Sequence, residues 1–166
     1  LMKNPDHDIL ETLPGPDFSN GAELLFDEAA TREIYSTGRG SFRLRAKWRY
    51  VKEGNLIEIT EIPYTTATEV IMDKVAELIK AGKAKEISDM RDETDLGGLK
   101  LTIDLKRGVD PDKLMAKLYR LTPLQDTVSC NFNILIAGMP RVLGVGGILE
   151  EWTAWRTAVS YTHLRA

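Results

Sequence analysis

Residues 37–51 read TGRGSFRLRAKWRYV, and this stretch decides the fold. Apolar side chains alternate strictly with cationic ones along it, which is the period of two that is typical of a half-buried β-strand. One face carries Phe42, Leu44, Ala46, Trp48 and Tyr50, and the other carries Arg43, Arg45, Lys47 and Arg49. Cations two residues apart on a strand lie roughly 6.6 Å from one another. The stretch therefore predicts a strand with one buried face and one ribbon of positive charge that suits a polyanion.

The charge of the chain is unevenly distributed. A formal net charge of −3 over 166 residues argues against a generally basic nucleic-acid-binding protein. Residues 1–36 contain eight acids and two cations, whereas residues 37–52 contain six cations and no acid. A merely solvated face usually mixes the two signs. The local excess of cations favours a phosphate-binding face, and an ordinary solvated face is the alternative.

The composition is that of a globular domain from a reducing compartment. With 43% hydrophobic and 28% charged residues, the chain can bury a core as one domain or as two small lobes that share a sheet. Cys130 is the only cysteine, which excludes a disulfide framework and a thiolate metal cluster. No apolar run reaches the length of a membrane span, and no signal peptide is visible. We expect a cytoplasmic protein without a membrane partner and, because the chain begins at Leu1, a fragment of something larger.

The rest of the pattern predicts an α+β fold. An acidic stretch at 27–35 is compatible with a short helix. Strands are expected at 56–62, 86–90, 99–106 and 128–134, and helices at 66–81, at 111–121 and from about 147. The order is β-β-α-β-β-α-β-α, and Thr66 with Glu69 has the spacing of a capping box, while Asp110 precedes an N1 proline. Short connections and strands with one polar face favour a mostly antiparallel sheet with helices packed on its other face.

A hairpin is expected after the basic strand, with a two-residue loop at Glu53 and Gly54. That loop would place Arg49 opposite Glu58, Lys47 opposite Thr60, and Arg45 opposite Ile62. In this register only one cation of the strand gains a facing carboxylate.

The other polar clusters have structural interpretations that we favour over functional ones. The acids Asp89, Asp92, Glu93 and Asp95 lack the spacing of a calcium loop and fit an ion-paired turn. The glycines at 38, 40, 144, 146 and 147 fit turns or a helix entry better than a phosphate loop. His7 and His163 have no second histidine at ligand spacing, Cys130 falls on an apolar strand face, and Tyr50 falls on the buried face beside Trp48.

Several motifs, taken in order, resemble the A subunit of bacterial type IIA DNA topoisomerases, which comprise DNA gyrase and topoisomerase IV. The resemblance covers about residues 2–159. It is carried by LPGPDF at 13–18, YSTGRGS at 35–41 with Arg45 and Ala46, EIPY at 61–64, ISDMRDETD at 87–95, LKR at 105–107, and Leu118-Tyr119 through Leu124-Gln125.

The resemblance implies a domain organisation and a role. Residues 1–143 would form the tower domain, the shoulder that supports the arms of the bent DNA gate segment. Residues 144–159 would begin the helix that leads to the coiled coil, and residues 160–166 would be a non-native tail. DNA phosphates would be contacted by Arg39, Arg43, Arg45, Lys47 and Arg49.

The resemblance also implies what the chain lacks. The nucleophilic tyrosine of the family would lie upstream of Leu1, so no catalytic residue is expected here and Tyr50 does not take that role. ATP and Mg²⁺ would bind the partner B subunit, so no cofactor and no metal are expected in this chain. Its partners would be double-stranded DNA, a second copy of the A subunit, plus the B subunit, in an A2B2 assembly associated with the bacterial nucleoid.

The sequence leaves alternatives open. It does not separate gyrase from topoisomerase IV. A non-catalytic nucleic-acid-binding module would use the same ribbon of cations and bind a short duplex tightly without a partner. A scaffold or dimerisation domain would cover the ribbon with the acidic N-terminal region and bind DNA negligibly.

Overall fold

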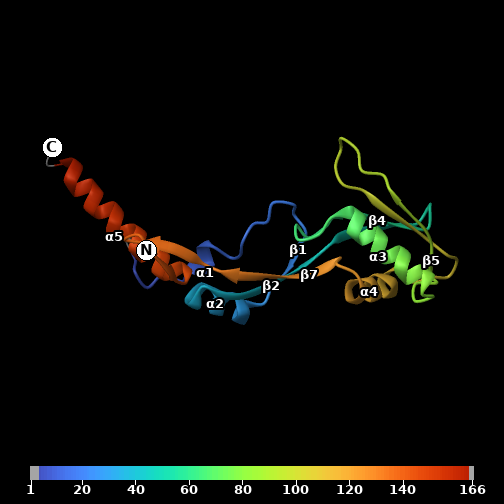
Figure 1. Ribbon diagram of the computed structural model, residues 1–166, viewed down its shortest axis with the longest axis horizontal. Coiled ribbons are helices and arrows are strands. Elements are labelled where there is room, and N and C mark those ends of the chain that lie inside the picture. The colour runs from blue at the N-terminus through green and yellow to red at the C-terminus, as the bar shows by residue number, and fades with distance from the viewer. Residues whose placement is uncertain (1–3, 165–166) are drawn as a thin grey trace. The chain divides into compact units, whose positions relative to one another are not determined.

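A computed structural model describes residues 4–164 of the chain, and Figure 1 shows its elements with many of them labelled. The helices are α1 (Ile9–Thr12), α2 (Glu28–Thr37), α3 (Thr68–Lys80), α4 (Pro111–Leu121) and α5 (Val145–Leu164). The strands are β1 (Glu23–Leu25), β2 (Arg39–Arg45), β3 (Lys47–Val51), β4 (Leu56–Glu61), β5 (Ile87–Asp92), β6 (Leu101–Leu105), β7 (Gln125–Asn131), β8 (Asn133–Ile136) and β9 (Met139–Val142).

The chain forms two compact units. Unit 1 comprises residues 1–16, 26–42 and 128–166, and unit 2 comprises residues 17–25 and 43–127. The boundary falls within β2 and within β7, so each of these strands contributes residues to both units. The expected division at residues 143 and 159 concerns domains of a larger protein and stays a prediction.

Unit 2 contains an antiparallel four-stranded sheet in the order β3-β4-β6-β5. One face of this sheet is apolar, because buried side chains alternate with polar ones along the strands. They join buried residues of α3 and α4 in a single cluster that includes Ile57, Ile59, Leu101, Ile103, Ile71, Val75, Leu114 and Leu118. This arrangement confirms the predicted α+β class with a mostly antiparallel sheet.

The order of elements is more complex than predicted. The expected basic strand is two strands, β2 and β3, and β2 lies between β1 and β7 in a separate three-stranded sheet. The expected strand at 128–134 ends at Asn131, and a hairpin of β8 and β9 follows it. The sequence order β-β-α-β-β-α-β-α therefore omits the helices α1 and α2, the short strands β1, β8 and β9, and the break in the basic strand.

Of the two predicted helix starts, one is correct and the other is wrong. Asp110 caps α4, because its carboxylate Oδ1 accepts a hydrogen bond from the amide of Asp112 at 3.1 Å. The predicted capping box at Thr66 was wrong. Helix α3 begins at Thr68, its N-cap is Ala67, and the amide of Thr66 instead closes a turn by donating to the carbonyl of Pro63 at 3.2 Å.

In unit 1 the helices α2 and α5 contact each other. Helix α2 is capped by Asp27 at its start and by Gly38, in the left-handed region at φ 74°, at its end. Gly144 precedes α5, and a Cβ there would overlap the carbonyl oxygens of Tyr35 and Ser36. Gly38 therefore ends a helix where a turn was predicted. Gly144 stands at the entry to α5, as predicted, and its close approach to the α2 backbone was not predicted. Helix α5 begins at Val145, two residues before the predicted start.

Candidate nucleic-acid interface

The basic stretch keeps its predicted alternation but not its predicted continuity. Phe42, Leu44 and Ala46 are buried, Trp48 is half-buried, and the cations Arg43, Lys47 and Arg49 are exposed. The strand breaks at Ala46 because the backbone of this residue bonds elsewhere. Its amide donates to the carbonyl of Leu124 at 2.8 Å, and its carbonyl accepts from the hydroxyl of Tyr119 at 3.1 Å.

Two cations of β3 are paired with carboxylates of β4. The Nε of Arg49 donates to Oε2 of Glu58 at 2.5 Å, and the predicted pairing of these two residues is confirmed. The Nζ of Lys47 lies 3.3 Å from the carboxylate of Glu61. The predicted pairing of Lys47 with Thr60 was wrong, because the register shifts between Lys47 and Trp48. Charge on β3 is thus largely balanced within the sheet.

Arg45 has a fixed guanidinium group. It pairs with Glu23 of β1 in the strand register, so its predicted position opposite Ile62 was wrong. Its Nε donates to Oε1 of Gln125 at 2.7 Å, and its guanidinium carbon lies 4.9 Å from the centre of the Tyr119 ring. A planar guanidinium stacks well on an aromatic face, which restricts its orientation.

Arg39 and Arg43 are the exposed cations of β2. Within residues 4–164, no carboxylate lies within 4 Å of either guanidinium, since neither residue is part of an ion pair. Arg39 belongs to unit 1 and Arg43 to unit 2. The assignment of DNA contacts to these residues stays a prediction. Among the unit 2 residues of β2, Arg43 is the one best placed to contact DNA.

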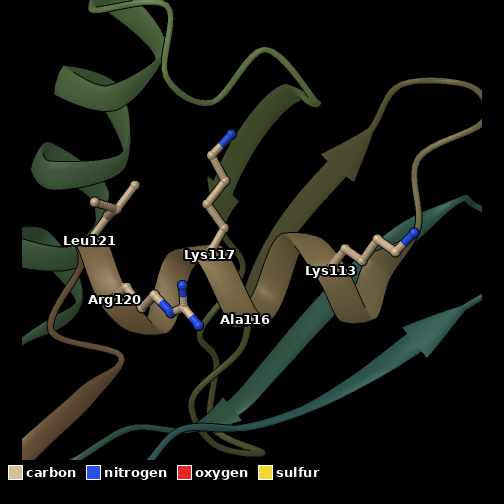
Figure 2. A pocket seen from close by; sticks show the side chains of 5 residues that line it. All are labelled: Lys113, Ala116, Lys117, Arg120 and Leu121. Carbon is tan, nitrogen blue, oxygen red and sulfur yellow. The ribbon is translucent and has the colours of Figure 1, made fainter.

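Helix α4 carries a basic face that the sequence analysis did not identify (Figure 2). Lys113, Lys117 and Arg120 lie at positions i, i+4 and i+7, which share one side of a helix. With Ala116 and Leu121 they line a shallow hollow of about 340 Å³. The helical spacing of these three cations is the sequence signal that could have revealed this face. The apolar stripe of the same helix, which includes Leu114 and Leu118, gives a stronger pattern in the sequence than the three cations do.

A second hollow of about 430 Å³ adjoins this face in unit 2. Arg45, Tyr119 and Arg120 line it, together with Glu23, Trp48, Asp112, Met115, Ala116 and Gln125. The two hollows share Ala116 and Arg120. Arg45 of β2 and the basic face of α4 therefore border one continuous stretch of the surface.

The acidic residues between 89 and 95 are tied to their own backbone or to cations. The carboxylates of Asp89, Asp92 and Asp95 accept from nearby amides at 2.7–2.9 Å. Glu93 lies 3.1 Å from Nζ of Lys100 and 3.7 Å from Arg91. The predicted ion-paired turn is thus only partly correct, because Asp89 and Asp92 lie within β5 and, in the described part of the chain, only Glu93 of the four acids is in an ion pair. The described residues contain no group of three or more His, Cys, Asp or Glu arranged to hold a metal ion.

The remaining candidates lie in structural positions. The hydroxyl of Tyr50 donates to Oδ1 of Asn55 at 2.9 Å, and its ring packs against the core of unit 2. Cys130 is half-buried, and burial raises the pKa of its thiol. His7 contacts the hydroxyl of Thr12 at 2.5 Å. The side chain of His163 lies outside the described residues.

Glu58 is the best-buried carboxylate of the polar sheet face, at 9% side-chain exposure between Arg49 and Lys100. The hydrogen bond from Arg49 is the main cause that lowers the pKa of its carboxyl, against a smaller opposing effect of desolvation. A lowered pKa in the folded state stabilises the fold above the unfolded-state pKa of about 4.3. This contribution is lost as the pH falls through the folded-state pKa.

We therefore expect Glu58→Gln to lower the free energy of unfolding at pH 7 by about 1 kcal/mol, because a charge-assisted hydrogen bond to a partly solvated partner is lost. The difference from the unsubstituted chain should shrink between pH 7 and pH 3, because protonation of Glu58 progressively removes the charge that Arg49 stabilises. Urea titrations at both pH values measure it. Glu77→Gln, at an exposed helix pair with Lys74, is the control and should change stability little. An equal loss at both pH values for Glu58→Gln would contradict this role.

The chain matches, over residues 1–165, a protein family described as the A subunit of DNA gyrase/topoisomerase IV. It therefore belongs to this family. Among the described residues, no helix is long and apolar enough to cross a membrane.

Individual relatives agree with this assignment. The chain is 37% identical over 164 residues to the DNA gyrase A subunit of Halalkalibacterium halodurans, with 96% of the chain and 20% of the relative covered. It is 37% identical over 167 residues to the DNA topoisomerase 4 A subunit of Caulobacter vibrioides, with 96% of the chain and 22% of the relative covered. A probable chloroplastic/mitochondrial DNA gyrase A subunit of Oryza sativa is 36% identical to the chain over 167 residues, with 96% of the chain and 18% of the relative covered. The chain thus spans about a fifth of the length of these relatives.

Proposed function

We propose that this chain is the part of a type IIA topoisomerase A subunit that holds duplex DNA by its sugar–phosphate backbone. The family assignment supports a DNA substrate. The single structural observation that carries the proposal is the exposed guanidinium of Arg43, which no carboxylate approaches within the described residues. Contacts to phosphate position a duplex without reading its sequence.

In the whole enzyme the chemistry would take place on other parts of the assembly. A tyrosine elsewhere in the A subunit would attack the DNA backbone and hold a covalent phosphotyrosine while a second duplex passes. ATP and Mg²⁺ would be bound by the partner B subunit in an A2B2 assembly within the bacterial cytoplasm. This chain would supply electrostatic positioning. Bending a duplex site costs about 1–6 kcal/mol, which phosphate contacts must offset.

A scaffold function is the second candidate, because Lys47 and Arg49 are satisfied by carboxylates of the same sheet. Those carboxylates, Glu58 and Glu61, come from β4 rather than from the acidic N-terminal region. Arg43 and Arg120 have no such partner among the described residues. The balance of charges on unit 2 therefore favours a role in binding an anion.

The test uses the 166-residue chain and a fluorescently labelled duplex of mixed sequence. We expect weak binding by fluorescence anisotropy, with a slope of log affinity against log salt of about −0.9 for each phosphate contact. Incubation with supercoiled plasmid should give no cleavage and no protein–DNA adduct that survives denaturation. Absence of binding at low salt would favour the scaffold, and tight binding to a short duplex would favour an independent nucleic-acid-binding module.

A further inference from the structure

We propose that the duplex backbone passes from Arg43 and Arg45 of β2 onto α4, where Arg120 and Lys113 bind further phosphates, instead of continuing along Lys47 and Arg49 of β3. This inference rests on the proposed function and names the part of unit 2 that performs it.

Arg45 has the properties of a preorganised phosphate ligand. Its Nε is held by Gln125 and its plane lies over the ring of Tyr119, so little side-chain freedom remains to be lost on binding. Its two Nη groups have no hydrogen-bond partner within residues 4–164. A guanidinium can offer two parallel N–H donors to a phosphate.

Arg120 connects this position with α4. It lines the hollow beside Arg45 and also the hollow beside Lys113. In the described part of the chain no carboxylate lies within 4 Å of its guanidinium, because Arg120 belongs to none of the ion pairs. Glu23 and Asp112 line the hollow beside Arg45, and they limit its net charge without pairing with Arg120.

Lys113 extends the basic face along the helix axis. Its side chain is 86% exposed, and its carboxylate neighbour, Asp110, is 3.8 Å away. Arg120 lies seven positions after Lys113 in the helix, which is about 10 Å at a rise of 1.5 Å per residue. One DNA strand presents a phosphate about every 3.4 Å along its axis, so the two cations can reach different phosphates. Lys117 lies between them but is paired with Glu86 at 2.9 Å.

The cations of β3 are less suited to this role. The carboxylates of Glu58 and Glu61 already accept from Arg49 and Lys47. A phosphate would have to compete with these ion pairs, and the nearly buried Glu58 would keep Lys100 alone as its partner. The path over α4 avoids this cost.

The first test compares salt slopes of duplex binding by the full chain. Lys113→Gln with Arg120→Gln should make the slope less steep by about 1.8, the effect of two phosphate contacts. Lys74→Gln with Lys80→Gln on α3 is matched in net charge and element type, and it should leave the slope nearly unchanged. Both pairs replace exposed helix residues, and circular dichroism checks that the fold is retained.

The second test locates the contact without a substitution. Acetylation of lysines followed by mass spectrometry should show Lys113 protected by bound duplex and Lys74 unprotected. Protection of Lys47 with no protection of Lys113, or an unchanged slope in the α4 variant, would overturn the α4 path while leaving the proposed function intact. Absence of any duplex binding by the unsubstituted chain would overturn both.

Discussion

Replacing Leu118 by alanine is expected to lower the free energy of unfolding of unit 2 by about 3 kcal/mol. Leu118 is fully buried in α4 and belongs to the core cluster shared by the sheet and both helices. The substitution removes three buried carbons and leaves a cavity that close-packed neighbours fill only in part. Destabilising α4 would also disturb the basic face that this helix carries. The substitution should therefore affect the proposed interface as well.

Tryptophan fluorescence can follow this loss in unit 2 alone. The chain has three tryptophans, and replacing the exposed Trp152 and Trp155 by phenylalanine leaves Trp48, which packs against the core of unit 2. Leu121→Ala on the same helix is the control, because Leu121 is 37% exposed and should cost under about 1 kcal/mol. Equal urea midpoints for the two variants would contradict the assignment of Leu118 to the core.

Replacing Gly144 by alanine should destabilise unit 1 by about 2–3 kcal/mol. The added Cβ would overlap the carbonyl oxygens of Tyr35 and Ser36, and backbone atoms cannot move aside as a flexible side chain can. The end of α2 and the start of α5 would have to separate. Hydrogen exchange should accelerate at the amide of Ile148, which donates to the carbonyl of Gly144 at 3.0 Å.

Gly146→Ala provides the matched control two residues further along the chain. A Cβ there would meet only Cδ1 of Ile9 at 3.5 Å, an ordinary contact. Because Gly146 lies within α5, alanine should leave stability unchanged or raise it by up to about 1 kcal/mol. Similar exchange rates in the two variants would show that the two helices do not meet closely at Gly144.

Local patterns in the sequence were sufficient to predict much of the fold. The alternation of Phe42, Leu44 and Ala46 with cations correctly assigned the buried face, and Asp110 correctly marked the start of α4. Features that depend on distant residues were not predictable in this way. The strand breaks at Ala46 because Leu124 and Tyr119 bond to its backbone, and neither bond leaves a local signal.

The candidate interface was predicted less completely than the fold. The sequence identified the cations of β2 and β3 but could not show which of them are paired, since the pairing of Lys47 with Glu61 depends on a register shift. The basic face of α4 was readable as Lys113, Lys117 and Arg120 at helical spacing. Its proximity to Arg45 depends on tertiary structure, which brings Tyr119 beneath the guanidinium.

Duplex binding by a variant with Arg43→Ala, Arg45→Ala and Lys47→Ala tests most directly whether this part of the chain holds DNA by its backbone. The slope of log affinity against log salt should become less steep by about 1.8–2.7, with Lys47 contributing least because Glu61 already pairs with it. A control variant with Lys74→Ala, Lys80→Ala and Lys83→Ala loses the same charge outside these strands, and its slope should stay close to that of the unsubstituted chain. A slope that is unchanged in the first variant, or changed equally in both, would remove this surface from the DNA interface.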